Sequence, residues 1–406
     1  MTKFNNLLMF LCLGSVLFGS SCWFQPVCGG ELAGRGDRWF TERQQVGQAG
    51  DDRADSDMPA TEAAPEPIPF QAGVCWVGAA DREGLAYLVE RGVGWVSVTP
   101  FAYGHREKSQ PPVGGYRASR FRGESLVGVS EVIDISQQLG LKVLLKPHIW
   151  FSTESAWRGD IAMGTEEDWK RWFDAYWDFL QPFVSLAAEK EVAAFCVGCE
   201  LAGTIGEEKR WRSLIAQIRK VYSGQLTYAA NWHDEYREIE FWDALDWMGV
   251  QAYFPLTDSK EPSEVALREG WIPWRAKLRE FSRTQNRPIV FTEVGYRPEV
   301  DNAREPWKWS LSGPSEPEAQ ANAFRALFDV FKGEEWLAGI HVWKWFAGYS
   351  GEDRPRRRRG HDSFSPQGLP AEEVIFERFR DLLKRRESDS KETNPEVKKP
   401  AASPPG

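Results

Sequence analysis

The chain has 406 residues, of which 42% are hydrophobic and 27% charged, a composition that suits one large folded domain with polar tails or two smaller domains. Its formal net charge of −9 at pH 7 argues against a nucleic-acid partner, because such partners select basic surfaces. Twenty tryptophans are many for this length, but tryptophan serves cores and interfaces as well as binding clefts, so their number alone decides little.

The N-terminal residues 1–22 predict an export signal. Lys3 gives a positive start, and residues 7–18 form an apolar run that is short for a membrane span. The small residues before Cys22 resemble a bacterial lipoprotein processing site, although Gly19 stands where an aliphatic residue is usual. We therefore expect an exported protein, extracellular or periplasmic. Membrane attachment through a lipidated Cys22 and ordinary cleavage with release both stay open.

Polar segments flank the folded part of the chain. Residues 23–69 are rich in Gly, Asp, Glu, Ala and Pro and predict a disordered tether. Residues 386–406 predict a second disordered tail. No convincing linker interrupts residues 70–385, so we expect one domain there, and a monomer by default.

Within residues 70–385, short apolar runs alternate with amphipathic stretches. The clearest helix begins after Thr165, a capping residue followed by three acidic residues and by aromatic side chains at helical spacing. Eight alternations predict an α/β fold, a (β/α)₈ TIM barrel. A doubly wound sheet is the alternative, although no glycine-rich phosphate loop follows the first strand. The predicted strands begin at Phe70, Gly94, Leu141, Val192, Leu226, Leu245, Arg287 and Gly339.

Cys196 and Cys199 have the spacing of a metal or redox motif, but they lie in an extended apolar run. Residues three apart in a strand are roughly 10 Å apart and face opposite sides. We therefore predict that the pair neither binds zinc nor forms a disulfide, and we expect no metal ion or cofactor.

Polar and aromatic residues collect where the predicted strands end. In a TIM barrel the active site lies at that rim. One such residue alone could be a loop cap or a salt-bridge partner, but so many at one rim indicate a functional site. They are Thr99, Lys146, His148, Glu200, Asn231, Trp232, His233, Gln251, Tyr253, Glu293, Tyr296, Trp343 and Lys344.

Glu200 and Glu293 end the fourth and seventh predicted strands. Glycoside hydrolysis needs one carboxyl group that protonates the leaving oxygen and a second that attacks or activates water. Their environments must split their pKa values. Alternation along the strands puts Cys196 and Gly198 on the face of Glu200, and Phe291 on the face of Glu293. We therefore expect both carboxyl groups to point into the barrel mouth.

The strand motifs resemble, in order, those of glycoside hydrolase family 113. They are LKVLLKPHIW, CVGCELAGT, LTYAANW, MGVQAYFPL, IVFTEVGY and GIHVWKWF, with SFSPQGLPAEEVI near the end. The resemblance implies a (β/α)₈ retaining enzyme, an endo-β-1,4-mannanase or a relative, that acts on a polysaccharide or oligosaccharide such as β-1,4-mannan.

The same resemblance implies roles for residues of this chain. Glu200 would be the general acid/base and Glu293 the nucleophile. Cys199 stands where many relatives have an asparagine that binds the sugar 2-hydroxyl, and a thiol is a poor hydrogen-bond partner, so the identity of the sugar stays open. Substrate contacts would come from Lys146, His148, Asn231, Trp232, Tyr253, Tyr296 and Trp343, although His148 could instead make a structural hydrogen bond and Trp343 could pack in the core.

Two other functions remain as alternatives. A metal-dependent barrel hydrolase could use His148, Glu200, His233, Glu293 and His341, but the chain has neither an H-x-H motif on the first strand nor an H-E-x-x-H helix. A non-catalytic glycan-binding lipoprotein on a degenerate barrel would need only the aromatic residues, so the presence of both glutamates argues against it.

Overall fold

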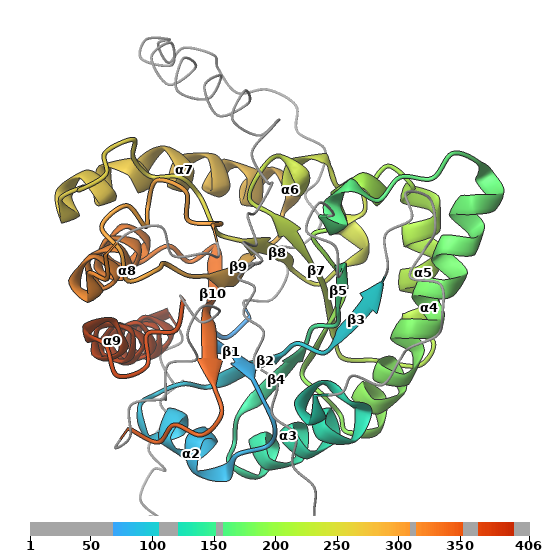
Figure 1. The fold of residues 1–406 in the computed structure, drawn as a ribbon, viewed down its shortest axis with the longest axis horizontal. Coiled ribbons are helices and arrows are strands. Elements are labelled where there is room, and N and C mark those ends of the chain that lie inside the picture. The colour runs from blue at the N-terminus through green and yellow to red at the C-terminus, as the bar shows by residue number, and fades with distance from the viewer. Residues whose placement is uncertain (1–67, 105–120, 152–156, 309–313, 352–363, 394–406) are drawn as a thin grey trace, which may run out of the picture. The chain divides into compact units, whose positions relative to one another are not determined.

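The computed structural model describes residues 68–104, 121–151, 157–308, 314–351 and 364–393; the expected export signal, Cys22 and nearly all of the expected tether lie outside them. Eight described strands form a closed parallel barrel in the order β1, β10, β9, β8, β7, β6, β4, β2 (Figure 1). The predicted (β/α)₈ barrel is therefore confirmed, and the open, doubly wound sheet is wrong. The barrel strands are β1 (Gln71–Val77), β2 (Trp95–Val98), β4 (Lys142–Leu145), β6 (Ala194–Cys199), β7 (Gln225–Asn231), β8 (Met248–Gln251), β9 (Ile289–Val294) and β10 (Leu337–Phe346).

Two further strands form a separate small sheet at the barrel mouth. The chain passes Pro100 after β2 and Pro147 after β4, and each proline lacks the N–H group that would continue the ladder. Beyond them, β3 (Phe101–Gly104) and β5 (His148–Phe151) pair in parallel as a separate two-stranded sheet. His148 therefore begins a strand of its own above the barrel.

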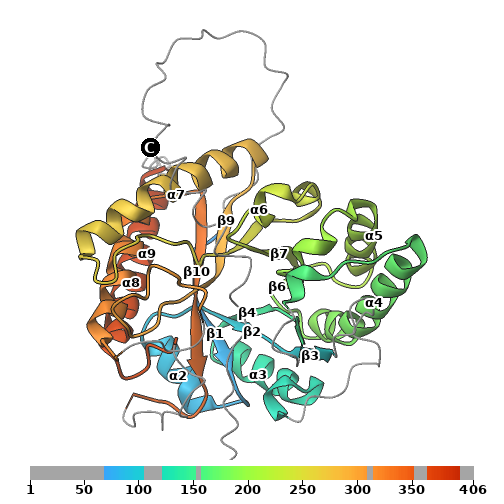
Figure 2. The ribbon, with the colours of Figure 1, turned by 45° about the horizontal axis from the view of Figure 1, so that its top comes forward.

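The described helices lie outside the barrel. Figure 2 shows α7, α8 and α9 beside β9 and β10, and α4 and α5 beside β6 and β7. As expected, Thr165 caps α4 by accepting a hydrogen bond from the backbone N–H of Asp168 at 3.1 Å. None of the described helices is long and apolar enough to cross a membrane. The longer helices are α2 (Arg82–Glu90), α3 (Leu126–Gln138), α4 (Glu166–Glu189), α5 (Glu208–Arg219), α7 (Glu264–Gln285), α8 (Pro317–Phe331) and α9 (Pro370–Thr393).

The last helix, α9, overlaps the start of the expected C-terminal tail. It continues to Thr393, past residue 386 where the tail is expected to begin. The guanidinium of Arg386 donates to the backbone oxygen of Leu337 at 2.7 Å, which ties this part of the helix to the start of β10.

Regular alternation does not set the direction of either catalytic candidate, so the alternation stated above is wrong. Glu293 follows a β-bulge in β9, and Glu200 lies just beyond one in β6, on a left-handed backbone. Gly198 turns towards α5, where an added Cβ would lie 2.7 Å from the Trp211 ring. Phe291 stacks outside the barrel on Trp271 of α7. An extra residue between Phe291 and Glu293 shifts the register of β9 against β8. The side chains after it therefore point to the opposite face of the sheet from the one that regular alternation predicts.

A second bulge, in β6, changes the predicted directions of the Cys196 and Cys199 side chains. The register of β6 against β7 shifts between Cys196 and Cys199. Both side chains consequently join the buried cluster that fills the barrel instead of facing opposite sides. Both are free thiols in the structure.

Candidate active site

Glu200 follows β6 directly, at the carboxyl end of the barrel, with a left-handed backbone at φ +51°. Its Oε1 accepts a hydrogen bond from Asn231 Nδ2 at 2.9 Å, and its Oε2 pairs with the guanidinium of Arg158. Burial raises the pKa of Glu200, and neither Arg158 nor Asn231, which both favour the charged form, reverses the shift. This environment suits a carboxyl group that donates a proton.

Glu293 has different neighbours. Its Oε1 accepts a hydrogen bond from Lys146 Nζ at 2.5 Å, and its Oε2 accepts one from the Tyr253 hydroxyl at 3.0 Å. Burial alone would lower the pKa of Lys146, but the charge of Glu293 raises it above its ordinary value, so the ammonium is charged. Both oxygens of Glu293 are thus oriented, one by the Lys146 ion pair and one by Tyr253, which suits attack rather than proton donation.

The buried ion pair predicts a large effect on stability. The Lys146 side chain is fully buried, and replacing it by methionine leaves the charge of Glu293 without its partner. We expect Lys146→Met to lower the free energy of unfolding by about 3–5 kcal/mol, measured by urea denaturation. The double variant Lys146→Met/Glu293→Gln should lose clearly less, because it buries no unpaired charge. A double variant as unstable as the single one would show that the ion pair does not cause the loss.

The two carboxyl groups lie at the same end of the barrel. Asn231, Gln251 and Glu293 are register partners at the ends of β7, β8 and β9, and Asn231 bonds Glu200 at the end of β6. The charge of Glu293 reaches Glu200 and adds to the rise of its pKa. Gln251 Nε2 donates to Cys199 Sγ at 3.1 Å, so the thiol lies among the strand ends that carry the two glutamates.

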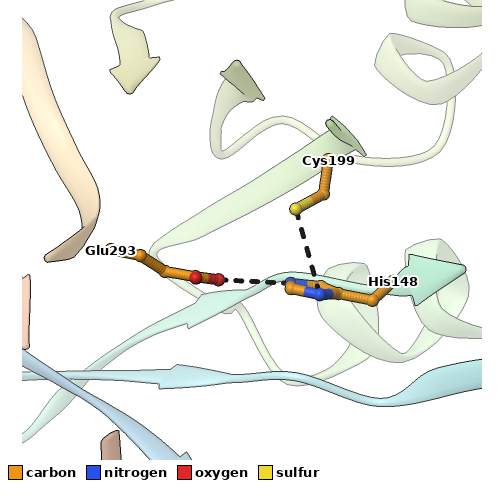
Figure 3. Close-up of side chains that lie close together, drawn as sticks. All are labelled: His148, Cys199 and Glu293. Atoms are coloured by element: carbon orange, nitrogen blue, oxygen red, sulfur yellow. Dashed lines mark hydrogen bonds and ion pairs between the residues drawn. The ribbon is translucent and has the colours of Figure 1, made fainter. Parts of the chain in front are cut away.

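His148 lies between Cys199 and Glu293 (Figure 3), with Nδ1 3.9 Å from the sulfur and Nε2 3.8 Å from Glu293 Oε1. Burial, together with the charges of Lys146 and Arg158, lowers the pKa of His148 well below its usual value, so the ring is neutral. Its Nε2 is buried without a hydrogen-bond partner, a position that suits a sugar hydroxyl.

The same three side chains lie close enough together to be considered as metal ligands. However, the imidazole turns a different nitrogen to each neighbour, and Lys146 already neutralises Glu293. A cation bound by all three side chains would have to displace the Lys146 ammonium from Glu293. The donor set therefore fits a metal ion poorly.

Two of the metal ligands considered from the sequence, His233 and His341, lie apart from this group. His341 lies inside the barrel, where Ser97 Oγ is 2.7 Å from its Nδ1 and Gln71 Oε1 is 3.0 Å from its Nε2. His233 lies beside Asp234 at 3.4 Å, on the loop after β7. Neither histidine joins the pair of glutamates.

Aromatic rings border the pocket. Trp343 stacks on His148 with ring centroids 6.4 Å apart and an interplanar angle of 9°, and Lys146 Nζ lies 5.8 Å from its centroid. Because Trp343 is partly exposed, it can form a floor for a sugar ring. Trp232 stacks on the exposed Trp307 with centroids 4.9 Å apart, beside Asn231.

Comparison with known proteins identifies the family. The profile described as Glycoside Hydrolase Family 113 matches residues 71–365, most of the chain. The chain belongs to glycoside hydrolase family 113. Its two glutamates therefore lie at the mouth of a glycoside hydrolase barrel, and the protein is an enzyme of that class.

Solved structures agree with this assignment. A GH113 β-1,4-mannanase shares 25% identity with this chain at a TM-score of 0.65, over 77% of this chain and 99% of the other. The GH113 β-mannanase of Alicyclobacillus acidocaldarius, solved in complex with ManMIm, shares 27% identity at 0.64, over 78% and 98%. A family 5 mannosidase from Rhizomucor miehei, at 12% identity and 0.56 over 80% and 95%, shares the fold. No curated protein sequence matches the chain.

One residue expected in this family 113 site lies elsewhere. Tyr296 is buried, with its ring edge-on to Phe324 of α8 at 5.3 Å between centroids. Its backbone oxygen accepts a hydrogen bond from Gln320 Nε2 at 2.8 Å. Tyr296 therefore packs between the barrel and α8, and the prediction that it borders the sugar is wrong.

Three residues that contact the predicted site residues were not predicted from the sequence. Arg158 lies in a short helical turn (Arg158–Asp160) after β5, away from any strand end. Trp307 lies in the loop after β9, where only its stacking on Trp232 shows its relevance. Glu235 begins α6 (Glu235–Glu238), and the signal that could have found it is a glutamate only four residues after Asn231.

Proposed function

We propose that this glycoside hydrolase cleaves β-linked polysaccharide by a retaining double displacement, and that β-1,4-mannan or manno-oligosaccharides are its preferred substrates. The observation that carries the proposal is the opposite environment of the two glutamates. Burial raises the pKa of Glu200, whereas Lys146 and Tyr253 each hold one oxygen of Glu293. The family 113 neighbours named as β-1,4-mannanases support mannan as the substrate.

The proposed reaction has two steps. First, a carboxylate oxygen of Glu293 attacks the anomeric carbon while Glu200 transfers its proton to the departing glycosidic oxygen. A covalent glycosyl-enzyme and a shortened glycan result. Glu200, now charged, then takes a proton from water, whose oxygen attacks the anomeric carbon and releases Glu293. The sugar keeps its β configuration because the anomeric carbon inverts twice.

Aromatic side chains on β3 and β5 support a substrate longer than one sugar. Phe101 pairs with His148 and Tyr103 with Trp150 across these strands, so all four rings lie on one face. Trp150 and Tyr103 are exposed, and Phe101 links them to His148 with centroids 4.9 Å apart. An exposed aromatic face that continues from the catalytic pocket suits the flat faces of successive sugar rings.

Replacing Trp150 by alanine tests this surface. We expect KM for mannan to rise by about 5- to 20-fold, or about 1–2 kcal/mol, because a sugar unit loses its stacking partner. The kcat for an aryl mannobioside, which is too short to cover the surface, should change by less than about twofold. Ile272→Ala, an exposed apolar residue on α7, serves as the control and should change neither value. Equal losses on both substrates would contradict a role for Trp150 in binding longer chains.

Hydrolysis itself is tested on a panel of glycans. Reducing-sugar release from mannan, glucomannan, xylan, cellulose and chitosan is measured with and without EDTA. We expect EDTA-insensitive hydrolysis, with mannan cleaved fastest. Loss of activity on chelation would favour a metal-dependent hydrolase, and glycan binding without hydrolysis would favour a binding protein.

A further inference from the structure

Glu235 is a buried glutamate that the proposed reaction does not use. Its Oε2 accepts a hydrogen bond from the backbone N–H of Asn231 at 2.6 Å, and its Oε1 accepts one from the Tyr228 hydroxyl at 2.5 Å. Burial raises the pKa of Glu235 to about 8, although both hydrogen bonds lower it. A carboxyl group in such surroundings opposes folding unless its partners compensate, so a role that explains it is expected.

Both partners of Glu235 lead to Glu200. Asn231 donates from its side-chain Nδ2 to Glu200 Oε1 at 2.9 Å. The Tyr228 hydroxyl accepts a hydrogen bond from the backbone N–H of Leu201, the residue after Glu200, at 2.8 Å. Glu235 thereby fixes two things through its neighbours: the carboxyl group of Glu200 and the peptide that follows it.

The backbone of Glu200 needs such support. Its left-handed conformation at φ +51° is unfavourable for a residue with a side chain, and it follows the bulge of β6. The glycine at position 198 leaves room for the Tyr228 ring, because an added Cβ there would lie only 2.5 Å from that ring. Arg158 holds the other carboxyl oxygen, so Asn231 and the Leu201 peptide decide where Oε1 points.

We propose that Glu235 and Tyr228 form a buried brace that positions Glu200 for proton transfer. The proposal rests on the proposed role of Glu200 as acid/base. Glu235 lies behind Asn231 and reaches the reacting atoms only through its neighbours, so it is a positioning residue. Its effect is on the geometry of proton transfer, and hence on kcat.

Two variants break the brace in different places. Glu235→Gln retains one acceptor oxygen for two donors, so either Asn231 or Tyr228 loses its partner. Tyr228→Phe removes the acceptor of the Leu201 N–H. We expect each to lower kcat on mannan by about 10- to 100-fold while KM changes by less than about twofold. The double variant should lose little more than the more damaged single variant, because both act through the same contacts.

A matched control separates positioning from simple stability. Glu372 of α9 is also buried, and it accepts hydrogen bonds from the Tyr87 and Tyr349 hydroxyls at 2.5 and 2.7 Å. Glu372→Gln should lower the melting temperature, as Glu235→Gln does, but leave kcat unchanged. If Glu235→Gln behaves in the same way as this control, the brace does not position Glu200 and the proposal is overturned.

A readout independent of activity completes the test. Hydrogen–deuterium exchange at the Leu201 amide should be faster in Glu235→Gln and Tyr228→Phe than in the wild type and in Glu372→Gln. Unchanged exchange overturns the brace even if activity falls. Faster exchange with unchanged kcat overturns its role in positioning. If the wild-type protein cleaves no glycan, the proposed function fails, and the role of the brace in catalysis fails with it. The same exchange differences between the variants would then still support the contacts of the brace.

Discussion

Replacing Glu293 by glutamine is expected to lower kcat on mannan by at least about 1,000-fold, which corresponds to about 4 kcal/mol. Glutamine keeps the size of the side chain and an oxygen that can accept the Tyr253 hydrogen bond. It lacks the charged oxygen that attacks the anomeric carbon and balances Lys146. Initial rates of reducing-sugar release, with substrate above KM, measure the loss.

The control for this variant is another ion-paired glutamate. Glu334 pairs with Arg279 just before β10 begins, at the opposite end of the barrel from the pocket. Glu334→Gln should retain the wild-type kcat. A loss of less than about tenfold in Glu293→Gln would mean that the nucleophile is another group.

The second large effect is expected for Glu200→Ala. Polysaccharide hydrolysis should fall by about 100- to 10,000-fold, because both the proton donor of the first step and the base of the second are gone. A dinitrophenyl glycoside, whose leaving group needs no proton, should still form the glycosyl-enzyme. Azide should then accelerate turnover and yield a glycosyl azide of retained configuration, because it attacks the intermediate without a base. Product analysis by NMR identifies this azide.

The pH dependence of the wild type follows from the same residue. Burial raises the pKa of Glu200, so it keeps its proton to a higher pH than an ordinary glutamate does. The wild-type rate on mannan should therefore fall with rising pH as Glu200 loses its proton. In Glu200→Ala with the dinitrophenyl substrate this alkaline limb should disappear. The same azide behaviour in Glu200→Ala and Glu293→Ala would contradict the assigned roles.

The barrel could be predicted because its signal is repeated. Eight apolar runs alternate with amphipathic stretches, and closure of the barrel brings their ends to one rim whatever the details of each strand. Glu200 and Glu293 could be selected from the sequence for the same reason, since each directly follows or ends an apolar strand.

The direction of each side chain could not be predicted in this way. The bulges in β6 and β9 each insert one residue, and a single residue reverses which face the rest of the strand presents. Glu293 reaches the mouth because of its insertion, whereas Glu200 depends also on its left-handed backbone at φ +51°. Tyr296, expected from the family resemblance to contact the sugar, follows Gly295 beyond the end of β9 and packs against α8.

Residues that act from loops gave no periodic signal. Arg158 and Glu235 belong to short helical segments between strands, and their importance follows from partners distant in sequence. Arg158 meets Glu200 across 42 residues, a contact that neither composition nor spacing specifies. The contact depends on where the fold places the short helical turn Arg158–Asp160 relative to the end of β6.

The central claim is that Glu293 forms a covalent bond to the sugar. It is tested most directly by incubating the wild-type protein with a 2-deoxy-2-fluoro-β-manno-oligosaccharyl fluoride and mapping the modified peptide by mass spectrometry. The fluorine slows release of the intermediate, so one added glycosyl group on Glu293 is expected, with none in Glu293→Gln. Turnover of mannan by a protein that is never labelled, or that is labelled at another residue, would contradict the claim.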